Sequence, residues 1–485
     1  MATQLHKLDD IDYARFRDFI AKRTGLHFPE KKRGDLERGV LEALSKSGHA
    51  SIATYFQSLA QNNGNSEMDR LVTLLTIGET YFYRDEGQFR LLQNDVLPKL
   101  ISERMATTRR LRIWSAGCAS GEEPYSVAII LRELIPYIDT WETLVLATDI
   151  NRRSLEKAAK GLYGQWSFRT MPGTWLDKYF FVSAGNKFHL SDMIKNSVTF
   201  RHLNLKSNVY PSFVNDTCEL DLIVCRNVAI YFEQETTDEI MNRFYDCLAD
   251  GGYLLMGASD PIPPADKFWT RNHSGVFIYQ KKSPSFEVRN KTRDLEPVKI
   301  RFSHRPAPKS SRKEPELEPT PVDLLTESQA LLEMGQPVLA ADKLAVILAT
   351  DPESIPGLLL MTKIEVASGH LRQAGKWAER VIKADKLNIH AYYLLSAIHQ
   401  GLGDEEKAIE ALKKTVYLDK RFIAGHFSLG CLYKKQKHLV MAEKAFKNVV
   451  RLMVGRPKDE IVPETNGITY GKLLQVAEKN LNAKE

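Results

Sequence analysis

The chain has 485 residues, which is too long for one ordinary hydrophobic core, so we expect several domains. A hydrophobic fraction of 43% with 26% charged residues is typical of a folded globular protein and excludes a disordered or fibrous chain. The net charge of +6 is modest for this length and does not indicate nucleic acid or a membrane surface as a partner.

Signals for export and for metal binding are weak in this sequence. It contains no run of about 18 uncharged apolar residues, and residues 1–10 carry acids in place of a long apolar segment. We therefore expect neither secretion nor direct membrane insertion. The five cysteines are scattered, with no Cys-x-x-Cys pair and no histidine at ligand spacing. This pattern favours a reducing, cytoplasmic location and no metal site.

The first part of the chain has a helical pattern. Apolar residues recur at steps of three and four from residue 10 to about 75, as in Phe16, Phe19 and Ile20. We assign residues 1–77 to a helical N-terminal domain. Basic residues crowd its first half: Arg15, Arg17, Lys22, Arg23, Lys31, Lys32, Arg33 and Arg38. They either steer an acidic partner or form an ordinary solvated helical surface.

Short apolar runs dominate the next part of the chain. They are LRIWSAG, TLVLATDI, DLIVCRN, GGYLLMG and GVFIYQ, each followed by a turn or a helical segment. This alternation predicts an α/β sheet covered by helices over residues 78–281. Residues 282–321 are rich in Pro, Ser and mixed charge and poor in aliphatic residues, so we assign them to a linker.

A repeat of 34 residues follows the linker. Three sets of residues recur at this spacing, and every member except Lys437 is small. The sets are Gly335, Gly369, Gly403 and Lys437; Ala340, Ala374, Ala408 and Ala442; and Ser328, Thr362, Ser396 and Gly430. Glycine or lysine suits the turn of a helical hairpin, and alanine suits the contact between its helices. Residues 322–453 resemble tetratricopeptide repeats, an all-α solenoid, and residues 454–485 are expected to form a helical tail.

The stretch IWSAGCASGEEPYS, residues 113–126, carries the strongest chemical signal. A strand runs into Gly117 and Gly121, and two acids follow at Glu122 and Glu123. A phosphate-binding loop requires lysine there, and carboxylates would repel a triphosphate. They suit S-adenosyl-L-methionine, which carries a sulfonium and an ammonium. Asp149, after the next strand, can bind ribose hydroxyls, although these features alone leave NAD open.

Six motifs together resemble the CheR family of chemotaxis receptor methyltransferases. They are ETYFYRDEGQF, SAGCASGEEPYS, ATDINRRSLEKAAKGLY, RHLNL, CRNVAIYF and GGYLLMGASD, in this order over residues 10–281. The resemblance implies a Rossmann-like methyltransferase domain that uses S-adenosyl-L-methionine and releases S-adenosyl-L-homocysteine. It also implies glutamate side chains on the cytoplasmic helices of a methyl-accepting chemoreceptor as the substrate.

The resemblance also implies a set of site residues. Cofactor contacts carry over to Thr80, Arg84, Glu122, Asp149, Asn204 and Leu205, with Gly117 in the loop. Arg226 and Asn227 would contact the cofactor beside the methyl-transfer path, where Tyr231 either packs or places its hydroxyl. Gly78 belongs to the same site, but the family usually has asparagine there. One expected amide is therefore missing, with weaker binding, a substituting water or lost activity as the possible consequences.

Two further features bear on partners. Family members carry a small antiparallel insert, expected here near residues 176–198, which in some members grips a receptor C-terminal peptide. The segment is short, so we favour a member that does not need this peptide. The repeats are expected to bind a separate protein, whose identity the sequence does not indicate.

The expected chemistry needs no general base, because glutamate is already ionised at neutral pH. Exclusion of water and alignment should contribute most of the catalysis. One alternative is a catalytically weak methyltransferase fold that acts as an adaptor through its repeats. Another keeps the cofactor but methylates a small molecule or RNA, although the sequence lacks a basic and aromatic RNA-binding motif.

Overall fold

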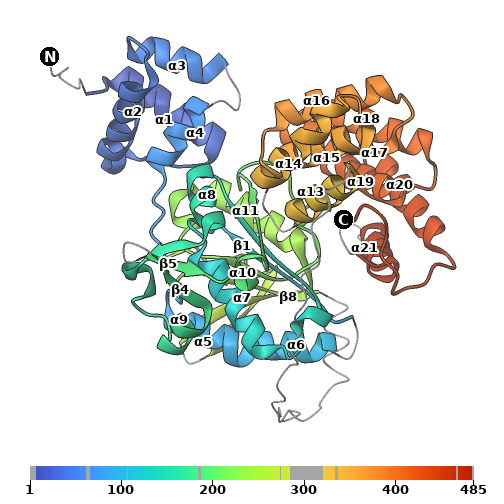
Figure 1. The fold of residues 1–485 in the computed structure, drawn as a ribbon, viewed down its shortest axis with the longest axis horizontal. Coiled ribbons are helices and arrows are strands. Elements are labelled where there is room, and N and C mark those ends of the chain that lie inside the picture. The colour runs from blue at the N-terminus through green and yellow to red at the C-terminus, as the bar shows by residue number, and fades with distance from the viewer. Residues whose placement is uncertain are drawn as a thin grey trace.

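The computed structural model describes residues 7–61, 66–105, 108–183, 187–273, 275–283, 321–333, 337–465 and 468–482. Three parts follow one another along the chain: a helical domain, an α/β domain and a helical repeat domain (Figure 1). Most of the linker expected at 282–321, from residue 284 to 320, lies outside the described residues. No helix within the described ranges is both long and apolar enough to cross a membrane.

The N-terminal domain is a compact set of helices. They are α1 (Asp10–Thr24), α2 (Arg33–Ser47), α3 (Ile52–Gln61) and α4 (Ser66–Leu75), with a short turn η1 (Glu30–Lys32). α1 begins where the Asp9 side chain accepts a hydrogen bond from the Asp12 N–H, and it ends at the left-handed Gly25. Phe16 and Ile20, predicted to share one face, are fully buried in the core of this domain.

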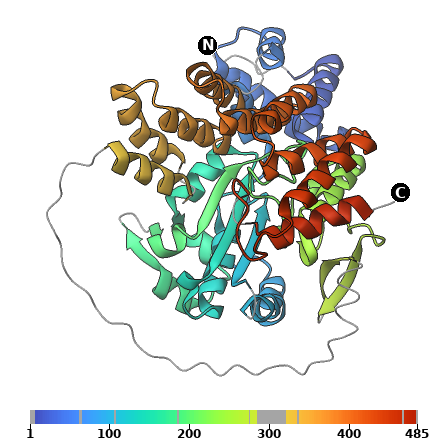
Figure 2. The ribbon, with the colours of Figure 1, turned by 90° about the vertical axis from the view of Figure 1, so that its right-hand side faces the viewer.

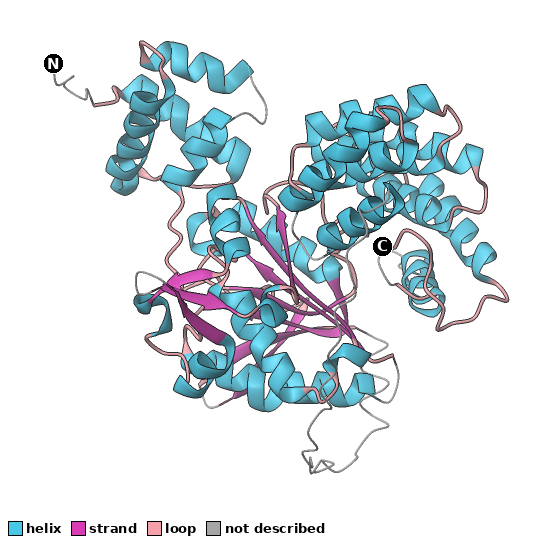
Figure 3. Ribbon diagram, viewed as in Figure 1, coloured by secondary structure: helices cyan, strands magenta, loops and turns pink. Residues whose placement is uncertain are grey.

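The α/β domain contains a seven-stranded sheet in the order β6-β2-β1-β7-β8-β10-β9. Figure 3 shows its strands with helices around them. The strands are β1 (Arg110–Ala116), β2 (Glu142–Asp149), β6 (Val198–His202), β7 (Leu220–Cys225), β8 (Leu248–Met256), β9 (Phe268–His273) and β10 (Val276–Lys281). β6, β2, β1, β7 and β8 are parallel, and the last two strands are antiparallel. The strand order reverses between β1 and β7, which leaves a crevice at their carboxyl ends.

Helices cover the sheet, and a small second sheet lies beside it. The helices are α5 (Glu86–Leu91), α6 (Leu97–Met105), α7 (Glu122–Leu134), α8 (Arg152–Lys160), α9 (Gly173–Tyr179), α10 (Asp192–Lys195) and α11 (Gln234–Cys247); the short turns are η2 (Leu92–Val96), η3 (Ile138–Thr140), η4 (Gln165–Phe168) and η5 (Ala229–Tyr231). The small sheet has the order β3-β5-β4, from β3 (Leu162–Gly164), β4 (Phe180–Ser183) and β5 (Lys187–Leu190). The insert expected near 176–198 therefore begins earlier, because β3 pairs with β5.

The C-terminal domain stacks helical hairpins into a solenoid. Its helices are α13 (Pro321–Glu333), α14 (Pro337–Thr350), α15 (Ile355–Ala367), α16 (Leu371–Ala384), α17 (Ile389–Gly401), α18 (Glu405–Leu418), α19 (Ile423–Lys435) and α20 (Leu439–Met453), followed by α21 (Tyr470–Asn482). Ala374 and Ala408 are fully buried between helices, and Gly369 and Gly403 adopt positive φ in the turns. A Cβ atom on Gly430 would lie 2.7 Å from the Phe446 ring, so this small residue is needed for helix contact.

The repeat domain packs directly on the α/β domain. Figure 2 shows the C-terminal helices beside the central sheet, and the contacts come largely from the loop between β6 and β7. Phe213 of this loop is buried against Phe427 of α19, with ring centroids 5.1 Å apart. Ion pairs join Lys472 to Glu219 at 3.0 Å and Lys479 to Asp250 at 3.1 Å. The solenoid is thus anchored by the α/β domain along part of its surface.

Candidate functional site

A cavity of about 180 Å³ opens at the carboxyl ends of β1 and β7, where the strand order reverses. The α/β domain forms its floor, and the helical N-terminal domain forms one wall through Thr24, Leu26 and Leu75. This is the place where open α/β sheets bind their ligands.

The glycine-rich loop after β1 lies against the opposite side of the cavity. Gly117 has φ of +84°, and a Cβ atom there would lie 2.4 Å from Cγ2 of Val228. The N–H groups of Gly117 and Cys118 donate to the Thr148 carbonyl oxygen, at 2.8 and 3.0 Å, and so hold the loop against β2. Glycine is therefore required at position 117, both for the backbone conformation and for the space.

Asp149 presents its carboxylate to the cavity from the end of β2. It accepts hydrogen bonds from the N–H groups of Ala119 at 2.9 Å and Asn151 at 2.8 Å. Burial raises the pKa of Asp149, and these backbone N–H groups partly offset the increase. A carboxylate has about four acceptor positions, so Asp149 retains capacity for the hydroxyls of a ribose.

The two glutamates that begin α7 point in different directions. Glu122, which the family resemblance assigned to the cofactor, does not line the cavity. Its carboxylate accepts from the hydroxyls of Ser120 at 2.8 Å and Ser167 at 3.1 Å, and its side chain is buried. Glu123 lines the cavity instead and accepts from the Ser115 hydroxyl at 2.8 Å. Burial raises the pKa of Glu123, opposed by the nearby Arg226 guanidinium.

Arg226 supplies buried positive charge beside these acids. One Nη2–H donates to the Arg84 carbonyl oxygen at 2.6 Å, and Nε lies 3.5 Å from a Glu123 carboxylate oxygen. Nε and Nη1 are buried, and no group in the described part of the chain accepts a hydrogen bond from them. Such unsatisfied donors are costly unless a ligand pairs with them, which indicates a negatively charged or carbonyl group in the bound ligand.

The loop after β7 is held by Asp260, which the sequence reasoning did not identify. Its buried carboxylate accepts from the N–H groups of Asn227 at 2.5 Å, Val228 at 3.1 Å and Ile230 at 3.2 Å. The Gly257 N–H adds a fourth bond at 2.9 Å. Asn227 sits at φ of +58°, a conformation that this network supports. The signal in the sequence was an acid just after a strand end, in GASD.

The N-terminal domain is joined to the site by specific contacts. The Asn204 amide donates to the Arg23 carbonyl oxygen at 2.7 Å, and the His27 N–H donates to the Tyr231 carbonyl oxygen at 2.8 Å. The Tyr231 ring packs on the core of this domain and also lines the cavity, so both roles considered for it remain compatible with its position. The cavity is therefore completed by two domains.

Apart from Glu122, the structure brings every site residue expected from the sequence to the cavity wall. These residues are Gly78, Thr80, Arg84, Gly117, Asp149, Asn204, Leu205, Arg226, Asn227 and Tyr231. The sequence indicated both Glu122 and Glu123 as acids suited to the cofactor, but the family resemblance assigned the contact to Glu122 alone. Asn151, whose amide donates to the Thr76 hydroxyl at 2.8 Å, was not assigned to the site.

The cavity suits S-adenosylmethionine in its charges. Asp149 and Glu123 are partly buried acids that match a ribose and a cationic donor, and the Nη1–H group of Arg226, which has no acceptor in the described part of the chain, matches a carboxylate. Within the described residues, no group of three or more His, Cys, Asp or Glu side chains is arranged to hold a metal ion.

Comparisons with known proteins agree with this chemistry. Residues 78–277 match the CheR methyltransferase SAM binding domain, residues 11–76 match the CheR methyltransferase all-alpha domain, and residues 389–422 match a tetratricopeptide repeat. The chain is 34% identical over 255 residues to chemotaxis protein methyltransferase 2 of Vibrio cholerae, covering 53% of this chain and 87% of that protein. It is 32% identical over 253 residues to the chemotaxis protein methyltransferase of Borreliella burgdorferi, covering 52% and 88%. The chain thus belongs to the CheR family of S-adenosylmethionine-dependent methyltransferases, with a C-terminal tetratricopeptide-repeat domain.

Proposed function

We propose that this chain methylates glutamate side chains on the cytoplasmic helices of a chemoreceptor-type protein, with S-adenosylmethionine as the donor. The observation that carries this proposal is the composition of the cavity. The described residues that line it include no histidine or lysine, and its three acids, Glu79, Glu123 and Asp149, are each already paired or hydrogen-bonded to groups of the protein, so none is a free general base. A glutamate substrate needs none, because its carboxylate is ionised at neutral pH.

When bound, S-adenosylmethionine supplies a methyl group attached to a positively charged sulfur. The chain's own residues orient the reactants and exclude water. Asp149 and Glu123 hold the cationic donor by charge and hydrogen bonds, and Leu26 and Leu75 of the N-terminal domain shield the cavity from solvent. Joining an anion to a cation removes charge, so a site with little water favours the transition state.

The basic surface of the N-terminal domain favours an acidic partner, but several of its basic side chains are already paired with acids. Arg17, Arg33 and Arg38 form ion pairs with acids of the same domain. Lys22 and Lys31 have no carboxylate within ion-pair distance in the described ranges. These lysines remain available to attract a glutamate-bearing helix, an effect that salt would weaken.

The proposal is tested by methyl transfer from labelled S-adenosylmethionine to receptor-containing membranes. We expect the label to be released as methanol by mild alkali, as a carboxyl ester requires. Asp149→Ala should reduce transfer by about tenfold to a hundredfold, since a hydrogen bond to a charged group contributes about 1.5–3 kcal/mol. Asp177→Ala, at an exposed position of α9, is the matched control and should leave transfer unchanged.

Two results would contradict the proposal. A label that resists alkali would exclude a glutamate ester. Folded wild-type protein that gives no heat of binding with S-adenosylmethionine in calorimetry would favour the adaptor alternative.

A further inference from the structure

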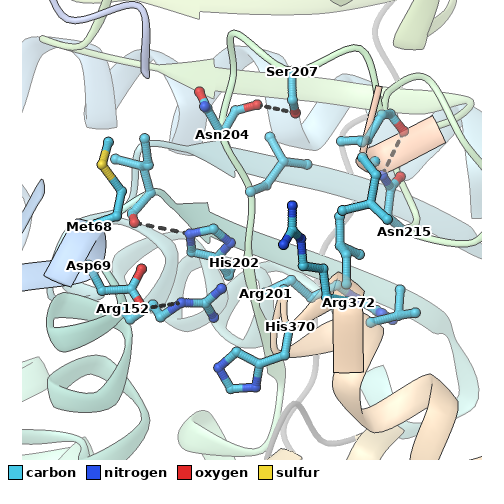
Figure 4. Close-up of a pocket in the computed structure, with 18 of the residues that line it drawn as sticks. Met68, Asp69, Arg152, Arg201, His202, Asn204, Ser207, Asn215, His370 and Arg372 are labelled. Carbon is cyan, nitrogen blue, oxygen red and sulfur yellow. Dashed lines mark hydrogen bonds and ion pairs between the residues drawn. The ribbon is translucent and has the colours of Figure 1, made fainter. Parts of the chain in front are cut away.

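A second and larger cleft, of about 610 Å³, lies where all three domains meet (Figure 4). Helices α1 and α4 of the N-terminal domain form one wall, and α8 and the end of β6 form the floor. The start of α16, the end of α17 and the loop between β6 and β7 form the rest. Thr24, Ile150, Leu203 and Asn204 line both this cleft and the cofactor cavity. The two spaces are therefore neighbours that share a partition.

Positive charge gathers in this cleft. Its charged or titratable lining residues are Arg23, Asp69, Arg152, Arg201, His202, His370, Arg372 and Lys376. Asp69 is the single acid in this set, and it pairs with Arg152 at 3.1 Å. Arg201 pairs with Asp216 at 2.6 Å. Arg23, Arg372 and Lys376 lie outside ion-pair distance of any carboxylate in the ranges that the structure describes, so three positive charges are uncompensated.

The uncompensated cations come from different domains but lie near one another. Burial and the charge of Arg372 lower the pKa of Arg23, which places an N-terminal cation close to a cation of the repeat domain. His202 adds no charge, because burial with Arg152 and His370 nearby lowers its pKa to about 3. Like charges from separate domains repel one another, so a bound anion would stabilise this arrangement.

The start of α16 adds backbone donors to the same wall. α16 begins at Leu371 after the turn at Gly369, and no side chain caps its first N–H groups. The turn packs closely on the α/β domain, since a Cβ atom on Gly369 would lie 2.4 Å from Nδ1 of His202. Arg372 stands in the first turn of this helix, beside these N–H groups. A helix N-terminus flanked by guanidinium groups is a favourable environment for phosphate.

We propose that this three-domain cleft binds a phosphorylated small molecule of nucleotide size. At about 610 Å³ this cleft is larger than the cofactor cavity of about 180 Å³, so it has room for a nucleotide. The partly exposed ring of Phe19 adds an apolar surface for a base, with the Arg23 guanidinium 5.4 Å from its centroid. A bound ligand would join the repeat domain to the partition that borders the cofactor, so it also offers a route by which the repeats influence catalysis.

The test is isothermal titration calorimetry of the full chain with ATP, cyclic diguanylate and inorganic pyrophosphate. We expect saturable binding of at least one of the three. Tighter binding of a nucleotide than of pyrophosphate would show that the base is recognised, and equal affinity would show a site for phosphate alone. Arg372→Glu and Lys376→Glu should each weaken binding by about tenfold, because each removes a charge-assisted contact.

Lys383→Glu is the matched control, since Lys383 is exposed on the same helix and does not line the cleft. It changes net charge by the same amount and should leave the affinity unchanged. Equal weakening in Lys383→Glu would show nonspecific charge attraction and overturn the proposal. It would also be overturned by competition from S-adenosylmethionine at the same site, by tighter binding of a poly-glutamate peptide, or by no saturable binding of the three probes at about 1 mM.

Discussion

At the cofactor cavity, the direction in which a side chain points matters as much as its chemical type. Glu122 and Glu123 are adjacent acids at the start of one helix, about 100° apart around its axis. The hydroxyl of Ser167, 45 residues farther along the chain, donates a hydrogen bond to the Glu122 carboxylate, whereas Glu123 lines the cavity. The motif in the sequence predicted an acid at this position, but a distant hydroxyl determines which of the two lines the site.

Gly78 is the residue at which this chain departs from its family, and the structure makes the departure testable. A Cβ atom there would meet nothing closer than the Ser154 hydroxyl at 3.7 Å and the Ala119 Cβ at 3.9 Å. Its φ lies outside the left-handed region, so other residues can adopt its backbone conformation. Glycine is therefore not required at this position by space or by backbone geometry.

We expect Gly78→Asn to fold normally and to bind S-adenosylmethionine about threefold to tenfold more tightly, as one added hydrogen bond implies. The measurement is calorimetric affinity, with Gly78→Ala as the control for the added Cβ atom. An equal gain in Gly78→Ala would assign the effect to backbone stiffening. Unchanged affinity in Gly78→Asn would mean that the amide does not reach the cofactor.

At the level of the element, the loop after β7 depends on a carboxylate that is remote in sequence. Four backbone N–H groups converge on Asp260, and through them the positions of Arg226 and Asn227 at the cavity are set. Burial raises the pKa of Asp260, and the N–H groups lower it in part. The ionised form is the one that can accept all four bonds.

Asp260→Asn should disrupt this loop, because an amide nitrogen would face N–H groups that need an acceptor. We expect methyl transfer to fall by at least about tenfold and the free energy of unfolding to fall by about 1–3 kcal/mol, the cost of unsatisfied buried donors. Initial rates and chemical denaturation measure the two effects. Asp266→Asn, an exposed change in the following segment, should alter neither. Full activity in Asp260→Asn would show that the loop does not need the charge.

Elements with strong periodicity were predictable, whereas the contacts between domains were not. The 34-residue spacing predicted helical hairpins, and Ala374 and Ala408 are fully buried where those helices touch. Five of the seven strands of the large sheet, β1, β2, β7, β8 and β10, were also visible as apolar segments, whereas β6 and β9 were not. β3 was missed because it has three residues and exists through pairing with β5. Short strands lack a local signal, since their partners provide most of their stability.

In the whole molecule, part of the surface of the repeat domain is covered by the loop between β6 and β7 of the α/β domain. The loop between β6 and β7 begins with Leu203 and Asn204, which line the cofactor cavity, and farther along it Phe213 packs on the repeats. This loop has no periodic pattern, so its contact with helices more than 200 residues away was not predictable from the sequence. Docking of the solenoid and the shape of the cofactor cavity are therefore connected through one short segment.

Phe213→Asp should release the solenoid from the α/β domain. Loss of a buried phenylalanine costs about 3–5 kcal/mol, and the new carboxylate would be desolvated among Phe427, Phe446 and Val449. We expect the radius of gyration from small-angle scattering to increase, while circular dichroism retains the helix and strand content. Phe181→Asp is the matched control, because Phe181 is 63% exposed and lies away from the repeats on β4. An unchanged radius in Phe213→Asp would mean that the ion pairs of Lys472 and Lys479 are sufficient to keep the domains docked.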